Sequence, residues 1–191
     1  IECINAMLGA RSLPLIESVE EYRKTFGFPV QGYYERCGFD FSVTPFPVLA
    51  QEYIELYRVA SASCTLSPGA IEALEAARKK GFRQIILSAS KKDALLEQVR
   101  AFPLSGYFSE ILGINDVYAA SKLDLAIRWL RGQSEDRKEI TMIGDSLHDL
   151  DVASAIGVRC VLYAKGHQAI TTTHRERNAV VDDLRDSLSL L

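Results

Sequence analysis

The chain has 191 residues, of which 48% are hydrophobic, and a formal net charge of -3. This length and hydrophobic content suffice for one sizeable domain with a smaller subdomain, and the acidic balance argues against a nucleic-acid partner. No apolar stretch approaches the roughly 20 residues of a membrane span, so a membrane partner is not expected either. The four cysteines are scattered without metal-site spacing, which favours a reduced, cytoplasmic protein.

Residues 1–65 have a helical pattern and are expected to form a small helical cap subdomain. Ser18 and Glu21 have the spacing of a capping box, at the start of a helix that should end near Gly27. A second helix is expected over residues 30–37. A third should begin at about Pro47, because apolar residues then repeat on one helical face, at Leu49, Tyr53, Leu56 and Ala60. A bundle of this size is expected to be too small to carry its own core comfortably.

Residues 66–191 alternate short apolar runs with amphipathic helices. This alternation predicts an α/β region built on a doubly wound parallel sheet. Its first helix should start at Ser67-Pro68 and stop at Gly81. Strands are expected over residues 84–87, 110–112, 140–143, 160–163 and 179–181. The first four are apolar throughout, which is typical of strands covered on both faces.

Polar residues follow two of these strands. Ser88 comes after the run at 84–87, Gly144-Asp145 comes after the run at 140–143, and Lys122 opens a helix between them. Ligands of doubly wound sheets bind outside the carboxyl ends of the strands. Asp145 and Asp149 are four residues apart and could approach the same edge, where Mg²⁺ would relieve their mutual repulsion. A metal ion, a lysine and a serine hydroxyl together suit phosphoryl transfer, because they neutralise charge on the phosphoryl oxygens.

Each of these residues also has a simpler explanation. Asp149 could merely complement the first turn of a helix whose N-cap is Ser146. Lys122 could be a solvated lysine, and Ser88 a turn residue. Gly144 favours the functional interpretation, since a glycine lets the backbone approach a ligand closely. Their joint placement favours a single site.

Four other residues are weaker candidates. Arg23, Lys24 and Arg36 in the helical part could contact an anionic substrate. His167 follows the last core strand and could line the pocket. Charged helix faces are usually only solvated, so a structural role is favoured for the three cations.

On these residues the chain resembles the haloacid dehalogenase superfamily of phosphatases. Leu87-Ser88-Ala89-Ser90 matches the second motif of that superfamily, Lys122 the third, and Gly144-Asp145-Ser146-Leu147-His148-Asp149 the fourth. Residues 1–65 look like the helical cap of a subfamily similar to phosphoglycolate phosphatases. The resemblance implies that Ser88 and Lys122 are catalytic and bind the phosphoryl group together with Ala89. It also implies that Asp145 coordinates magnesium and that Asp149 holds the outer shell of the metal.

The first motif of the family, Asp-x-Asp on the first strand, is absent. Its first aspartate forms the aspartyl-phosphate and its second acts as acid and base. We expect an upstream segment of roughly 15 residues, one strand and its turn, to supply this motif. In the family that strand is central, and its loss would leave two neighbouring strands with an unpaired edge. The alternative is a degenerate, non-catalytic relative.

The predicted function is therefore a Mg²⁺-dependent phosphatase of a small phosphorylated metabolite similar to phosphoglycolate, acting through an aspartyl-phosphate intermediate. A phosphomutase of the same superfamily is one alternative. A catalytically inactive binding or regulatory module is the other. The sequence pattern does not indicate whether the protein is a monomer or an oligomer.

Overall fold

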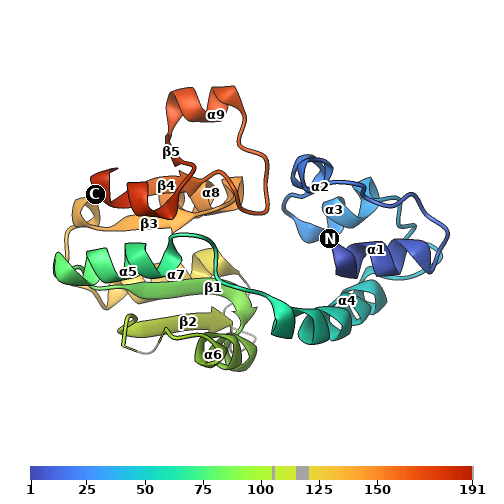
Figure 1. The fold of residues 1–191 in the computed structure, drawn as a ribbon, viewed down its shortest axis with the longest axis horizontal. Coiled ribbons are helices and arrows are strands. Elements are labelled where there is room, and N and C mark those ends of the chain that lie inside the picture. The colour runs from blue at the N-terminus through green and yellow to red at the C-terminus, as the bar shows by residue number, and fades with distance from the viewer. Residues whose placement is uncertain (105, 115–120, 191) are drawn as a thin grey trace.

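The computed structural model describes residues 1–104, 106–114 and 121–190. A helical region (residues 1–63) lies at one end of the molecule, and its longest helix leads into an α/β region (residues 70–190) (Figure 1). The predicted subdomain boundary at residues 65 and 66 falls in the connection between the two, and it stays a prediction. No helix in the described ranges is both long and apolar enough to cross a membrane.

The helical region contains α1 (Glu2–Gly9), α2 (Val19–Thr25), α3 (Val30–Arg36), α4 (Phe46–Ala60) and the short 3-10 helix η1 (Ser61–Ser63). Ser18 is the N-cap of α2, and its hydroxyl accepts a hydrogen bond of 3.1 Å from the Glu21 N–H. Pro47 lies in the first turn of α4. Both features follow from the sequence pattern, because capping and proline placement are local properties of the chain.

The helical region has a continuous core of its own. Nine buried side chains form it: Ile4, Met7, Leu8, Ile16, Tyr33, Tyr34, Cys37, Phe39 and Leu49. Met7, Leu8 and Leu49 have no exposed surface. The expectation that this region is too small for a comfortable core is wrong, because aromatic side chains bury a large area for each residue.

The α/β region contains every strand that the sequence predicts. Its first helix starts later than expected, because residues 67–69 form a turn and Gly69, with φ 79°, is the N-cap of that helix. The elements are α5 (Ala70–Lys79), β1 (Ile85–Lys91), α6 (Lys92–Ala101), β2 (Glu110–Ile114), α7 (Lys122–Arg131), η2 (Arg137–Glu139), β3 (Thr141–Gly144), α8 (Leu147–Ile156), β4 (Arg159–Tyr163), α9 (Thr172–Arg177), β5 (Ala179–Val181) and η3 (Leu184–Leu190).

The strands form two parallel sheets, β1-β2 and β3-β4-β5. Helix α7 contacts β1, β2 and α8, and α8 contacts β3 and β4, so the two helices together connect the two sheets (Figure 1). The 3-10 helix η3 packs against β4 and β5. The apolar contacts between α7 and α8 include Leu87 of β1 and Met142 of β3. The expected α/β class with parallel strands is confirmed, with helices packed against the sheets.

Coverage of the strands on both faces is found only in β4, where Val161 is 2% exposed and Leu162 is fully buried. The β1 residues are half-buried or exposed, and Ile143 of β3 is 43% exposed. The expectation that the first four strands are covered on both faces is therefore wrong for β1 and β3. Among the described residues, β1 and β3 each have one edge without a neighbouring strand, which leaves their side chains partly open.

Candidate active site

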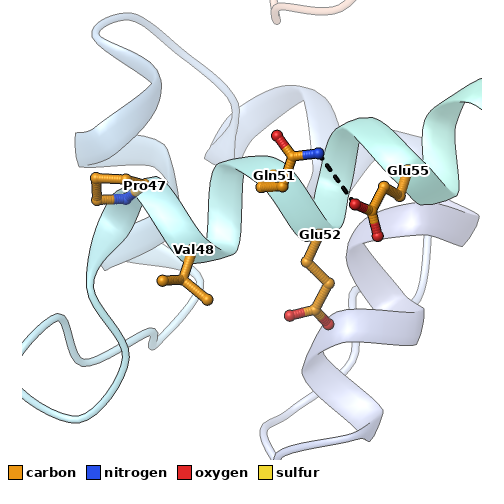
Figure 2. A pocket seen from close by; sticks show the side chains of 5 residues that line it. All are labelled: Pro47, Val48, Gln51, Glu52 and Glu55. Atoms are coloured by element: carbon orange, nitrogen blue, oxygen red, sulfur yellow. Dashed lines mark hydrogen bonds between the residues drawn. The ribbon is translucent and has the colours of Figure 1, made fainter.

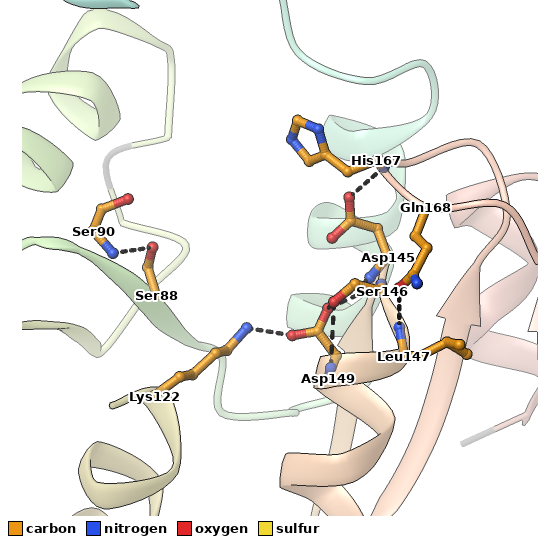
Figure 3. A network of polar contacts seen from close by, with 9 residues as sticks. All are labelled: Ser88, Ser90, Lys122, Asp145, Ser146, Leu147, Asp149, His167 and Gln168. Carbon is orange, nitrogen blue, oxygen red and sulfur yellow. Dashed lines mark hydrogen bonds and ion pairs between the residues drawn. The ribbon is translucent and has the colours of Figure 1, made fainter. Parts of the chain in front are cut away.

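Asp145 lies directly after β3, at the carboxyl end of the strand. One oxygen of its carboxylate, Oδ2, accepts a hydrogen bond of 2.8 Å from the backbone N–H of His167 (Figure 3). The other oxygen has no hydrogen-bond partner among the described residues. Asp145 can therefore offer one oxygen to a ligand while the protein holds the other.

Asp149 is buried, with 3% of its surface exposed, and its Oδ2 accepts three hydrogen bonds. The donors are the Asp145 N–H at 3.0 Å, the Ser146 N–H at 3.1 Å and the Ser146 hydroxyl at 2.8 Å. Ser146 is the N-cap of α8, and with Asp149 it forms a capping box. The simpler explanation of Asp149, as the acid that completes the first turn, is thus realised in the structure.

Gly144 is required by this arrangement. A Cβ at this position would lie 2.3 Å from the Cβ of Asp149, far closer than two such atoms can approach. The close neighbour of the glycine in the structure is the Asp149 side chain, and the approach of a ligand to this backbone stays a prediction. The carboxylate is in this way packed directly against the end of β3.

Lys122 is the first residue of α7, as expected, and the Ser121 side chain caps that helix. Its Nζ lies 2.5 Å from Oδ1 of Asp149, and the two side chains are 15% and 5% exposed. Burial alone would raise the pKa of the Asp149 carboxyl, but the Lys122 charge and the hydrogen bonds from Ser146 and Asp145 lower it below its ordinary value. The Asp149 carboxyl is therefore favoured in its ionised form.

Ser88 and Ala89 lie inside β1 rather than after it, because the strand continues to Lys91. Regular pairing with β2 ends at Leu87 opposite Leu112 and resumes at Lys91 opposite Ile114, so residues 88–90 form an irregular stretch. The Ser88 hydroxyl accepts a hydrogen bond of 3.1 Å from the Ser90 N–H. An irregularity of this kind turns side chains out of the regular ladder, which a simple apolar pattern does not reveal.

Figure 3 shows which predicted site residues come together. Lys122, Asp145 and Asp149 belong to one hydrogen-bonded network. Ser88 lies on β1, across Lys122 from Asp145, and in the described part of the chain no hydrogen bond joins it to either. Ala89 is exposed beside Ser88. The roles assigned to these five residues stay predictions.

The three candidate cations Arg23, Lys24 and Arg36 each bond to other groups of the protein. Arg23 donates to the carbonyl oxygens of Lys165 and Gly166, at 2.6 and 2.8 Å. Lys24 pairs with Glu20 at 2.6 Å, and the Arg36 Nε donates to the Thr25 carbonyl at 2.8 Å. These internal bonds favour the structural explanation, and a role of the three residues in substrate binding stays a prediction.

Two residues of the loop after β4 belong to the site and were not predicted from the sequence. A Cβ at Gly166 would lie 2.1 Å from the Cβ of Asp145, so the backbone of this loop packs directly on the Asp145 side chain. The side-chain oxygen of Gln168 accepts a hydrogen bond of 2.8 Å from the Leu147 N–H. The glycine is the one local signal, since it permits close approach. The proximity of His167 to the site agrees with its position after the last core strand.

A separate hollow of about 430 Å³ lies along the exposed face of α4 (Figure 2). Its lining includes Glu52 and Glu55 and no cation, together with Pro47, Val48 and Gln51. Carboxylates repel a phosphate, so this hollow is not suited to a phosphorylated ligand. The candidate site is the polar network at the end of β3.

Of the two predicted magnesium residues, Asp145 and Asp149, only Asp145 has a carboxylate oxygen that accepts no hydrogen bond from the described residues. Within residues 1–104, 106–114 and 121–190, no group of three or more His, Cys, Asp or Glu side chains is placed to hold a metal. Mg²⁺ is usually held by one or two carboxylates together with water and substrate phosphate, so the available oxygen of Asp145 suits it. Both oxygens of Asp149 are already engaged, which suits that residue to orienting its neighbours.

Parallel strands, helices packed against the sheets and an acidic residue at a strand carboxyl end define an α/β protein with a candidate ligand site at the strand ends. The family model for haloacid dehalogenase-like hydrolases matches residues 1–163, and the chain belongs to this family. A comparison with curated protein sequences gives no match.

Solved structures share the fold. A haloacid dehalogenase-like family hydrolase from Streptococcus pneumoniae is 15% identical with a TM-score of 0.82, covering 99% of this chain and 88% of its own. A predicted phosphatase from Clostridium acetobutylicum is 17% identical with a TM-score of 0.78, covering 100% and 90%. A predicted phosphoglycolate phosphatase from Haemophilus somnus is 19% identical with a TM-score of 0.70, covering 98% and 88%. At these identities the likeness shows the fold.

Proposed function

We propose that this protein is a cytoplasmic, magnesium-dependent phosphatase that hydrolyses a small phosphomonoester through an aspartyl-phosphate intermediate. The observation that carries the proposal is the buried Lys122–Asp149 pair beside Asp145, at the carboxyl end of β3. A buried ion pair costs desolvation energy, and its retention at a strand end is typical of a site that handles charge.

The protein residues have separate tasks in this proposal. Asp149 holds the Lys122 ammonium with one oxygen and the first turn of α8 with the other. Lys122 can turn its remaining N–H donors towards phosphoryl oxygens, and the Ser88 hydroxyl can donate to another. The His167 N–H fixes the Asp145 carboxylate, which would hold the magnesium ion. When bound, the metal would neutralise charge on the phosphoryl group.

The nucleophile is the aspartate that the family resemblance predicts on a further strand. Among the described strands, β1 and β3 each have an edge without a partner, which is compatible with a strand placed between them. That aspartate would attack phosphorus and release the alcohol, and water would then hydrolyse the aspartyl-phosphate. The docked helical region would limit water access during the first step.

A substrate similar to phosphoglycolate is supported by the helical region and by the printed name of the Haemophilus somnus relative. Arg23, Lys24 and Arg36 each bond within the protein with part of their N–H donors, which favours a structural role for them. Recognition of a carboxylate on that substrate would therefore rest mainly on other groups near Asp145.

The test is release of inorganic phosphate from p-nitrophenyl phosphate by the protein as its gene encodes it, including any residues before Ile1. We expect activity that requires Mg²⁺, and an Asp145→Asn variant with kcat at least 100-fold lower, because one charged group at the phosphoryl site is lost. Asp151→Asn is the matched control, since Asp151 is an exposed acid on α8 and should retain full activity. Full activity of Asp145→Asn would refute the assignment.

Product analysis separates the related activities. Free phosphate supports a phosphatase, whereas transfer of the phosphoryl group to another position of the substrate would show a phosphomutase. Calorimetric binding of Mg²⁺ with a phosphate mimic, without turnover of any phosphomonoester, would show a binding module instead.

A further inference from the structure

The loop of residues 164–171 between β4 and α9 is bonded to the candidate site. The His167 N–H donates to Asp145, and Gln168 accepts from the Leu147 N–H, both at 2.8 Å. Gly166 has no room for a side chain, because Asp145 packs against its backbone. A shift of this loop therefore moves a hydrogen-bond donor away from the Asp145 carboxylate.

The same loop lies beside the helical region (Figure 1) and is hydrogen-bonded to it. The Arg23 guanidinium donates to the carbonyls of Lys165 and Gly166, and the Ala169 N–H donates back to the Arg23 carbonyl at 2.9 Å. The Tyr22 hydroxyl lies 2.8 Å from Nδ1 of His167. One turn of α2 thus binds the residues that immediately flank the contact with Asp145.

We propose that Arg23 is a positioning residue that couples docking of the helical region to the Asp145 carboxylate through residues 165–169. The inference rests on the proposed function in one respect, that Asp145 holds a magnesium ion. A guanidinium that bonds two successive carbonyls holds them in a defined orientation, which a lysine at this position would not do. Coupling of this kind is reciprocal, so cation binding at Asp145 strengthens docking as much as docking strengthens cation binding.

Two backbone amides report the two halves of the coupling without any assay of activity. The Ala169 N–H bonds to α2 and reports docking, whereas the His167 N–H bonds to Asp145 and reports the site. Hydrogen exchange of both amides is measured by NMR in the metal-free protein. In Arg23→Gln we expect both to exchange about tenfold faster or more, because loss of the guanidinium opens the loop locally.

Lys24→Gln is the matched control. Lys24 neighbours Arg23 on α2, but it is exposed and pairs with Glu20 on its own helix, so both amides should exchange as in the unchanged protein. Tyr22→Phe keeps the packing of α2 and removes one hydroxyl, and it should accelerate the His167 amide by a smaller factor. This second variant decides the question if Arg23→Gln does not fold.

Faster exchange at Ala169 with unchanged exchange at His167 would overturn the proposal, since docking would then not position Asp145. Unchanged exchange at both amides would overturn it as well.

Calorimetric titration with MgCl₂ adds the reciprocal test: Arg23→Gln should weaken Mg²⁺ binding about fivefold or more, and Lys24→Gln should not. Equal Mg²⁺ affinity, or none in the unchanged protein, would refute the link to the cation. Coupling without phosphate release would instead contradict the proposed function and leave this inference intact.

Discussion

The helical region and the α/β region bury their side chains in different ways. The helical region has one continuous core of nine buried residues. The α/β region has smaller clusters, such as Ala126, Val152 and Ile156 between α7 and α8, and its buried residues include the polar Ser146 and Asp149. A helix satisfies its backbone internally and needs only an apolar face, whereas a parallel strand also needs a partner on each edge.

This difference shows where polar and charged side chains lie inside the fold. Packing is least complete along β1 and β3, where Ile143 is exposed and Ser88 lies in an irregular stretch. The Lys122–Asp149 pair lies at this same place, joining α7 to α8. The α/β region therefore relies on a buried charge pair where the helical region relies on apolar contact.

The sharpest test of this comparison is removal of one partner from the buried pair. Lys122→Met should lower the free energy of unfolding by about 3–5 kcal/mol, because it leaves the Asp149 carboxylate buried and uncompensated. Urea denaturation measures this change. Lys24→Met removes an exposed pair, with side chains 66% and 78% exposed, and should cost no more than about 1 kcal/mol. Equal losses in the two variants would break the comparison.

A cavity in the helical core should have a somewhat smaller effect. Leu8 has no exposed surface, and Leu8→Ala should lower the free energy of unfolding by about 2–4 kcal/mol, while Val59→Ala, at a residue 70% exposed, should change it by less than about 0.5 kcal/mol. We expect the Asp149 and Ser146 amides to keep their protection against hydrogen exchange in Leu8→Ala. Loss of that protection would mean that the two regions unfold as one unit.

The smallest effects should come from pH, and they should have opposite signs in the two regions. The pKa of Asp149 is lowered in the folded protein, so its ionised form stabilises the α/β region above the unfolded pKa of about 3.9. That contribution is lost as the pH falls through the lowered folded pKa. Asp149→Asn should therefore make the stability of the protein depend less steeply on pH below about 4.

Tyrosines packed into the helical region should make its stability depend on pH at the alkaline end. Burial raises the pKa of Tyr53 to about 12, so its neutral form stabilises the fold below the unfolded pKa of about 10, and this contribution is lost as the pH rises through the folded value. Near-UV circular dichroism should show loss of tyrosine packing above about pH 10. A Tyr53→Phe variant with the same alkaline transition as the unchanged protein would contradict this assignment.

Much of the fold could be predicted from the sequence, because helix caps and apolar periodicity depend on residues close together in the chain. Ser18 caps α2 and Lys122 opens α7 because capping and apolar periodicity depend on residues three or four apart. The strand positions follow from apolar runs in the same way. The strand bounds were less predictable at β1, because Ser88 continues the strand through an irregular stretch that depends on its pairing with β2.

The sequence by itself determined the α/β class, the helical N-terminal part and the order of Ser88, Lys122 and Asp145 along the chain. Only the tertiary structure decided that Lys122 bonds to Asp149, 27 residues away, and that Arg23 bonds to the backbone at Gly166, 143 residues away. It also decided that both carboxylate oxygens of Asp149 accept hydrogen bonds, one from Lys122 and the other from Ser146 and the Asp145 backbone. Contacts between residues so far apart in the sequence depend on how the helices pack on the sheets. The apolar periodicity of a single helix or strand does not specify that packing.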